Sequence, residues 1–188
     1  MTVFTEFELG VLETIQSIRC GFLDFIIPKI SFLGNSGLIW IAAALLLLCF
    51  KKTRKWGITL AIALIMCLLL NNLTLKNLVA RPRPFQVDTT IQLIISPPNE
   101  YSFPSGHALS CFAAATVLLY YDKKRLGPAA LILAALIGFT RLYLRVHFPS
   151  DVLGGAIIGV FFGFLAIAAA QAAFKAADRF RDKKAKEK

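Results

Sequence analysis

Long apolar segments alternate with short polar or basic ones along most of this chain. The clearest apolar segments cover residues 36–50, 56–79, 105–121, 127–144 and 151–174. A helix needs roughly 20 apolar residues to cross the hydrocarbon core of a bilayer, and these segments meet or approach that length. They do not alternate with a period of two, as the strands of a membrane barrel would. The pattern predicts an all-α, polytopic membrane bundle of about six transmembrane helices.

The N-terminal segment has a different pattern. Phe4, Phe7, Val11 and Ile15 recur at helical spacing, and acidic residues lie between them. This pattern predicts an amphipathic helix over residues 1–19 that lies along the membrane interface or against the bundle. Residues 20–33 read as a short apolar helix. Residues 4–33 therefore form either one tilted crossing or an interfacial helix followed by a short insertion.

Composition and charge support a membrane protein. Hydrophobic residues make up 57% of the chain, charged residues 17%, and the mean hydropathy is +0.66, which excludes an ordinary soluble domain. The net charge of +10 would suit a nucleic-acid partner. However, Lys and Arg gather at residues 51–55, 123–125 and 175–188, where apolar segments end. Such clusters are typical of cytoplasmic loops, so no nucleic-acid partner is expected. We expect a single membrane-embedded domain over residues 1–188 in the cell membrane, with 175–188 as a basic cytoplasmic tail.

The remaining ionisable residues gather at the opposite ends of the predicted spans. If the basic clusters are cytoplasmic, the 80–104 loop and the 145–150 turn are extracytoplasmic. Ionisable residues at membrane depth are costly and by default suggest function. The hairpin formed by residues 105–146 brings its two ends together, so these side chains can converge. They are Lys76, Arg83, His107, Arg141, His147 and Asp151.

This set of residues suits phosphate chemistry. Lys76, Arg83 and Arg141 can bind the oxygens of a polyanion. Ser105 and Gly106 open a helix whose free N–H groups favour an anion, and we expect Ser105 both to cap this helix and to contact the ligand. His147 can attack phosphorus, Asp151 can orient its ring, and His107 can protonate the leaving group. The reaction requires no metal or other cofactor.

Three segments carry a resemblance to a known family. Lys76-x6-Arg83-Pro84, Pro104-Ser105-Gly106-His107 and Arg141-x5-His147-x3-Asp151 resemble the three-part signature of the type 2 phosphatidic acid phosphatase superfamily. That family contains integral lipid phosphatases and soluble vanadium-dependent haloperoxidases. The resemblance implies a six-helix membrane bundle, metal-independent hydrolysis and the residue roles given above. Thr140 stands where the family usually has serine and keeps the hydroxyl. Arg81 and Arg145 fall outside the signature, and we interpret both as membrane anchors.

The resemblance also implies a class of substrate, a phosphomonoester or diphosphate of a membrane lipid, cleaved through a phosphohistidine. Undecaprenyl diphosphate is favoured because its recycling needs an outward-facing site, and phosphatidylglycerophosphate and phosphatidate are alternatives. A non-catalytic binder or carrier of lipid phosphates is a second class, which the presence of both histidines disfavours. A haloperoxidase-like oxidase holding vanadate is a third class, which the apolar spans disfavour.

Overall fold

The computed structural model describes residues 2–71 and 75–186, and within these ranges the chain forms helices and no strands. This confirms the predicted all-α class. The helices, in chain order, are α1 Val3–Gln16, α2 Gly21–Leu33, the 3-10 helix η1 Asn35–Gly37, α3 Leu38–Cys49, α4 Arg54–Leu70, α5 Lys76–Val79, α6 Pro84–Val87, α7 Gly106–Tyr121, α8 Leu126–Tyr143 and α9 Pro149–Lys186.

Two of these helices, α8 and α9, are long and apolar enough to cross a membrane. A third candidate is the pair of α2 with η1 and α3, which is bent by 45°. Helix α7, with 16 residues, is a shorter apolar helix, and α4 has 17 residues. The structure therefore supports a membrane bundle but does not confirm about six spans. The single span expected over residues 56–79 contains α4 and α5, and residues 72–74 between them lie outside the described residues.

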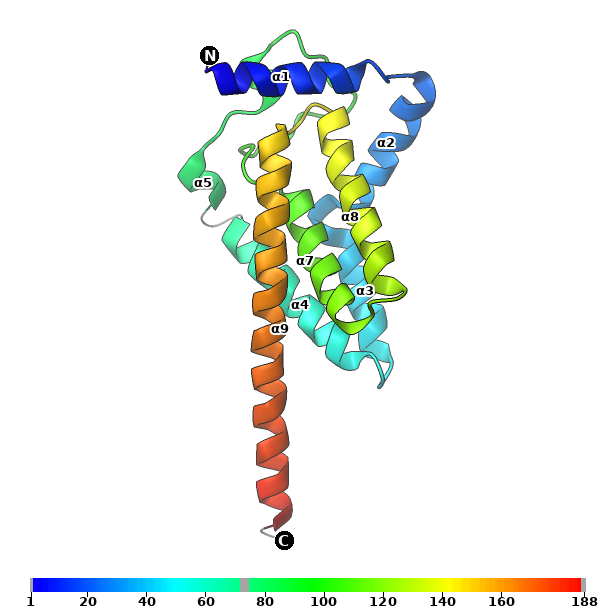
Figure 1. Cartoon of the computed structure of the whole chain (residues 1–188), viewed down its shortest axis with the longest axis vertical. Helices are drawn as coiled ribbons and strands as arrows, with labels where there is room; N and C mark the ends of the chain where they lie inside the picture. The colour runs from blue at the N-terminus through cyan, green and yellow to red at the C-terminus, as the bar shows by residue number, and fades with distance from the viewer. Residues whose placement is uncertain (1, 72–74, 187–188) are drawn as a thin grey trace.

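Helix α1 lies crosswise over one end of the bundle, whereas α2 descends along its side (Figure 1). Residues 4–33 thus form two helices of different direction and not one continuous helix. In α1 the side chains of Phe4 and Phe7 are exposed, and those of Glu8 and Leu12 are buried. The helix is amphipathic, but its buried face includes a carboxylate.

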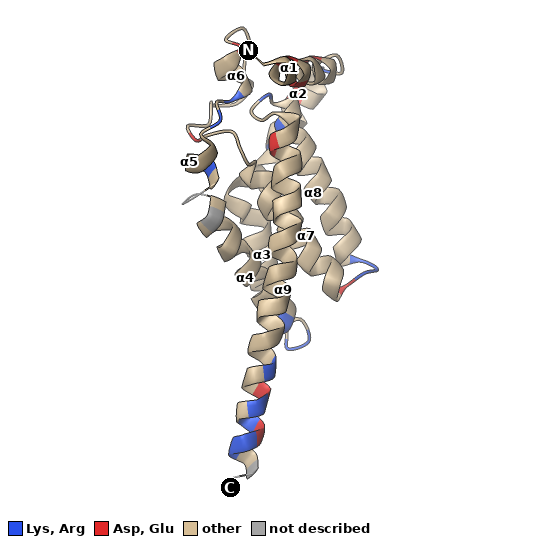
Figure 2. Cartoon of the chain, turned by 60° about the vertical axis from the view of Figure 1, so that its left-hand side comes forward, with Lys and Arg blue, Asp and Glu red and all other residues tan. Residues whose placement is uncertain are grey.

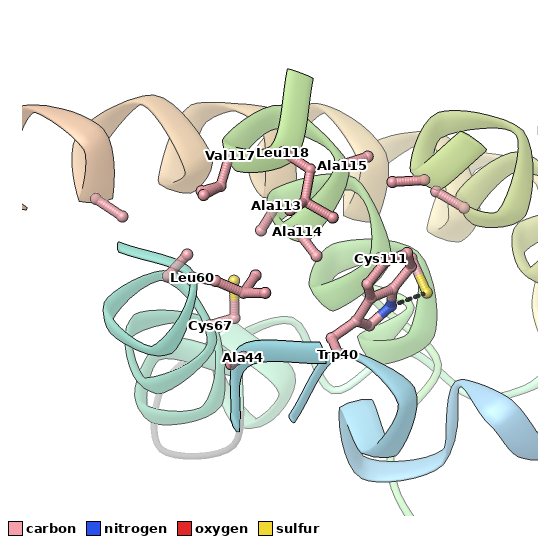
Figure 3. Close-up of a cluster of buried hydrophobic side chains, with 14 of the residues drawn as sticks. Trp40, Ala44, Leu60, Cys67, Cys111, Ala113, Ala114, Ala115, Val117 and Leu118 are labelled. Carbon is pink, nitrogen blue, oxygen red and sulfur yellow. Dashed lines mark hydrogen bonds between the residues drawn. The ribbon is translucent and has the colours of Figure 1, made fainter. Parts of the chain in front are cut away.

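Helix α7 lies at the centre of the bundle, packed against α3, α4, α8 and α9. Small and aliphatic side chains fill this core, and the Trp40 indole N–H donates to Cys111 Sγ at 3.0 Å (Figure 3). Glycines of α9 allow a close approach to α7, since a Cβ on Gly155 would lie 2.7 Å from the Ser105 carbonyl oxygen. At the same crossing the Ser105 N–H donates to the Asp151 carbonyl at 3.0 Å. The core therefore fixes the start of α7 against the start of α9.

The two ends of the bundle differ in charge. Lys and Arg gather in the α3–α4 loop, the α7–α8 loop and the far end of α9, away from α1 (Figure 2). The 80–104 loop and the turn between α8 and α9 lie at the other end, next to α1 (Figure 1). The residues of the tail continue α9 as a helix to Lys186. The fold thus separates the basic loops from the end that holds the predicted site.

Candidate active site

All the predicted site residues lie at the α1 end of the bundle, where the 80–104 loop meets the start of α7, the end of α8 and the start of α9. Most of them are buried despite being charged or polar. The buried members are Lys76, Arg83, Ser105, Arg141, His147 and Asp151. Because burying an ionisable group is costly, such a cluster at one place in the fold is a candidate functional site.

Arg83 is held mainly by backbone carbonyls. Its Nε donates to the Glu100 carbonyl at 2.6 Å, and its Nη1 donates to the Val146 carbonyl at 2.7 Å. The same Nη1 lies 3.3 Å from His147 Nε2. No carboxylate among the described residues forms an ion pair with this guanidinium. Its charge is therefore oriented beside the histidine without being neutralised there.

Arg141 lies deep at the end of α8. Its Nη1 donates to Ser31 Oγ at 2.5 Å, and its Nε has no hydrogen-bond partner in the part of the chain that the structure describes. Arg141 and His107 line a cavity of about 480 Å³ together with residues of α2 and the 80–104 loop. A buried guanidinium that lines a cavity of this size is suited to an anionic ligand.

Lys76, in α5, completes the cation pocket, which we define as Lys76, Arg83 and Arg141. Its ammonium forms an ion pair with the Glu100 carboxylate, which is 62% exposed. The hydrogen bond from Lys76 lowers the pKa of the Glu100 carboxyl below its usual value. Of the three cations in the pocket, Lys76 alone forms a direct ion pair with a carboxylate of residues 2–71 or 75–186. An exposed carboxylate can move aside when an anion binds.

His147 lies in the turn before α9, with its two ring nitrogens in different environments. Nε2 faces Arg83, and Nδ1 lies 3.7 Å from Asp151 Oδ2. This distance is longer than a hydrogen bond, so the predicted orienting contact is a close approach in this structure. Burial lowers the pKa of His147 to about 4. The imidazole is therefore neutral at neutral pH and keeps the lone pair that a nucleophile needs.

His107 is in the first turn of α7 and faces η1. Its Nε2 lies 2.8 Å from Asn35 Oδ1. An amide oxygen only accepts hydrogen bonds, so we assign a proton to Nε2. His107 is also close enough to Arg141, His147 and Lys76 to interact with them electrostatically. The two histidines thus belong to one cluster, although they come from different segments.

The start of α7 differs in detail from the prediction. Ser105 occupies the N-cap position, but its side chain makes no capping hydrogen bond, and the buried Oγ has no partner among the described residues. The prediction of a side-chain cap is wrong. A Cβ on Gly106 would lie 3.0 Å from the Asn71 side-chain amide. The backbone at Gly106 thus lies close to the Asn71 side chain, directly after the end of α4.

Sequence reasoning missed two residues that reach the site. Arg81, interpreted as a membrane anchor, donates to Asp151 Oδ1 at 2.6 Å and to Glu8 Oε2 at 2.5 Å. The anchor interpretation of Arg81 is therefore wrong. A signal existed for each. Arg81 lies beside the signature residue Arg83 in a proline-bounded part of the loop, and Glu8 lies one helical turn before the apolar Leu12.

A helical membrane bundle with a buried cation pocket at one end is the class of protein that this geometry defines. The model of the PAP2 superfamily matches residues 54–175, and the chain belongs to this family. The resemblance drawn from the three sequence segments is thereby confirmed.

Similar proteins include enzymes that act on lipids. The undecaprenyl-diphosphatase of Sulfolobus acidocaldarius is 38% identical over 129 residues, which cover 69% of this chain and 62% of that protein. The match thus spans less than two thirds of that relative's length. A transmembrane PAP2-type phosphatidylglycerolphosphate phosphatase from Bacillus subtilis has a TM-score of 0.75 at 26% identity, covering 92% of this chain and 88% of that one. LpxE of Aquifex aeolicus has a TM-score of 0.70 at 29% identity, covering 85% and 94%.

Proposed function

We propose that this protein is a metal-independent lipid phosphate phosphatase with His147 as its nucleophile. The observation that carries the proposal is the position of His147 Nε2, 3.3 Å from Arg83 Nη1 beside the buried cation pocket. A neutral imidazole there can reach the phosphorus of an anion held by Arg83. Membership of the PAP2 superfamily and the phosphatases among its similar proteins support the same reaction.

The first step transfers the phosphoryl group to the enzyme. The cation pocket, Ser105 Oγ and the free N–H groups at the start of α7 bind the phosphate oxygens. The lone pair of His147 Nε2 forms a bond to phosphorus as the bond from phosphorus to the leaving oxygen breaks. His107, which becomes an imidazolium by binding a second proton beside the phosphate anion, gives a proton to that oxygen and returns to its neutral form. Asp151 stabilises the positive charge that develops on the His147 ring, the role a carboxylate plays beside a catalytic histidine.

The second step returns the enzyme to its starting state. His107, now neutral, accepts a proton from a water molecule that attacks phosphorus. The bond from phosphorus to His147 Nε2 breaks, inorganic phosphate forms, and the imidazole recovers its lone pair. The cation pocket stabilises charge on the phosphoryl oxygens in both steps, as expected for phosphoryl transfer.

Among lipids, we favour undecaprenyl diphosphate, because the relative from Sulfolobus acidocaldarius bears the name of that activity. Phosphatidylglycerophosphate is the main alternative, on the basis of the Bacillus subtilis structure, and phosphatidate is a third. The basic loops at the opposite end favour an orientation with the C-terminus in the cytoplasm and the site on the extracytoplasmic side. The substrate would then come from the outer leaflet of the cell membrane.

A substrate panel tests this proposal. Purified protein in detergent, with EDTA present, is expected to release phosphate from at least one of the three lipids. His147→Ala is expected to abolish release, whereas Lys124→Ala, at the opposite end of the bundle, leaves it unchanged. Substrate labelled with ³²P on the transferred phosphoryl group is expected to leave an acid-labile label on the wild type and none on His147→Ala. Full activity of His147→Ala would refute the nucleophile assignment. Tight lipid-phosphate binding without release would instead support the non-catalytic carrier.

A further inference from the structure

A buried hydrogen-bonded network connects α1 to the turn that carries His147. We call Glu8, Arg81, Ser150 and Asp151 the Arg81 network. Arg81 bridges the carboxylates of Glu8 and Asp151 with its two terminal nitrogens. The second oxygen of Glu8 accepts from the Ser150 N–H at 2.9 Å and from Ser150 Oγ at 2.7 Å. Glu8 is only 1% exposed and Asp151 is fully buried, so each carboxylate depends on these donors.

The charges of this network bear directly on His147. Two carboxylates share one guanidinium, so the network carries a net negative charge next to His147 Nδ1. If Glu8 were neutral, the charges of Arg81 and Asp151 would cancel in a one-to-one ion pair. Asp151 would then stabilise a positive imidazole less well. Glu8 thus supplies the charge that leaves Asp151 able to act on the histidine, although Glu8 itself does not touch the ring.

The network also fixes the shape of the turn. Glu8 binds the backbone N–H of Ser150, which lies between His147 and Asp151. The guanidinium of Arg81 lies over the Phe148 ring, 4.1 Å from its centroid. Both contacts are made within three residues of His147. A change at Glu8 would therefore alter the direction of the imidazole while leaving the cation pocket in place.

We propose that Glu8 and Arg81 are positioning residues, through which α1 completes the catalytic site by acting on Asp151 and the His147 turn. The inference rests on the proposed function, which makes His147 the nucleophile. It assigns a role in turnover to the N-terminal helix, which contributes none of the residues of the three-part signature.

Glu8→Gln is the sharpest test, because it keeps the size of the side chain and removes its charge. We expect kcat to fall by about tenfold or more, because small errors in the placement of a reacting group are costly. KM should stay within about threefold, because the phosphate contacts are unchanged. Glu6→Gln and Glu13→Gln are matched controls on exposed positions of the same helix and should leave kcat unchanged.

Further measurements separate positioning from a general loss of structure. Vanadate, a phosphate mimic, should bind Glu8→Gln and the wild type with equal affinity, and Glu8→Asp should recover part of the lost kcat. Arg81→Lys should keep more activity than Arg81→Ala, because an ammonium preserves the positive charge, although it cannot bridge two carboxylates with two separate nitrogens as the guanidinium does. A parallel fall in vanadate affinity and kcat would show a merely structural role and overturn the proposal.

The pKa of His147 can be measured without any assay of activity. The chain contains only two histidines, so ¹⁵N-imidazole spectra of the protein in detergent can be assigned with His107→Gln. Loss of the Glu8 charge should lower the pKa of His147, whereas Glu6→Gln should not change it. The other groups that face His147 are the same in both variants, namely Arg83, Arg141, Glu100, Asp151 and His107.

These results distinguish the two proposals. Equal pKa values and equal kcat in Glu8→Gln and Glu6→Gln would overturn the role of Glu8. A wild type that releases phosphate from none of the lipids would refute the proposed function. In that case the His147 titration still decides whether Glu8 acts on the ring.

Discussion

Arg81 and Arg83 are separated by a single proline but have opposite surroundings. Arg83 donates to the carbonyl oxygens of Glu100 and Val146, which are neutral. Arg81 donates to the carboxylates of Glu8 and Asp151, which neutralise it. A buried cation held by neutral acceptors retains its charge for a ligand, whereas a cation between two carboxylates fixes the positions of the groups around it. The partners of each arginine, and not the residue type, therefore indicate its role.

The local backbone explains how neighbouring arginines separate. Pro82 and Pro84 restrict the backbone at alternate positions, and Arg83 has an extended conformation with φ −83° and ψ 160°. In an extended segment, alternate side chains point the same way only if the chain does not twist or turn. Here α6 begins at Pro84, directly after Arg83, and Arg81 follows the left-handed residue Ala80. The turns on both sides direct one arginine to the cation pocket and the other to the Arg81 network.

The largest effect is expected at His147, which lies between the two regions. Its pKa is lowered from 6.5 to about 4, so it should bind a proton about 300-fold more weakly than an ordinary histidine. Because the unfolded chain binds this proton more readily, the stabilising contribution of neutral His147 should be lost as the pH falls from 6.5 towards 4. A ¹⁵N titration checks the value, and His147→Gln should remove this part of the acid sensitivity. A midpoint near 6.5 would contradict the buried, neutral state.

The next effect is expected from the cation pocket. Arg141→Ala should lower kcat/KM by about 100-fold, because charge-assisted hydrogen bonds to a phosphate contribute roughly 1.5–3 kcal/mol each. Vanadate affinity should fall as well, in contrast to the result expected for Glu8→Gln. Arg125→Ala, in the basic loop at the other end, is the control and should change neither quantity. If Arg141→Ala lowered kcat alone, the distinction between binding and positioning residues would fail.

A smaller effect is expected where α7 and α9 cross, since this crossing joins the two regions. Gly155→Ala places a Cβ 2.7 Å from the Ser105 carbonyl oxygen. Forcing the helices apart should lower the free energy of unfolding by about 1–3 kcal/mol. Gly10→Ala is the matched control, because a Cβ at Gly10 meets nothing within 4 Å. Thermal unfolding in detergent measures the stability of both variants. Equal midpoints would show that the crossing accommodates the added Cβ at position 155.

The smallest effect is expected at Glu100, the exposed partner of Lys76. Glu100→Gln removes a carboxylate that competes with phosphate for the ammonium. Exposed ion pairs contribute roughly 0–1 kcal/mol, so vanadate should bind up to about fivefold more tightly. Asp88→Asn, an acidic position in the same loop, should leave the affinity unchanged. Weaker vanadate binding in Glu100→Gln would mean that the carboxylate orients Lys76 for the ligand.

The sequence predicted the cation pocket better than the Arg81 network, for a physical reason. Lys76 and Arg83 have a fixed spacing in one segment of the signature, Arg141 has one to His147 in another, and the fold brings those segments together. Glu8 belongs to no such segment. Its partner Ser150 is 142 residues away, and their contact depends on how α1 docks. The spacing of His147 and Asp151 predicted a hydrogen bond, but Asp151 Oδ2 instead accepts from Ser102 and the Phe148 N–H. The roles of the site residues stay predictions until the variants are measured.

The all-α fold class could be predicted from the sequence, but the number of transmembrane helices could not. Apolar segments fixed the helical character, whereas helix ends depend on packing that the pattern does not contain. Helix α7 agrees with its apolar segment to within one residue at its start, whereas the segment expected as one span over 56–79 contains the two helices α4 and α5. The direction of α1 was also left open, because an amphipathic pattern suits a membrane surface and a protein surface equally.

The hydrogen bonds from Ser150 to Glu8 have a consequence for biosynthesis. Ser150 leaves the ribosome 142 positions after Glu8. During this interval the glutamate has no Ser150 to bind, so α1 can dock in its final place only after the turn before α9 has been synthesised. Nascent chains that stop before α9 should therefore expose α1 to proteases, and full-length chains should protect it.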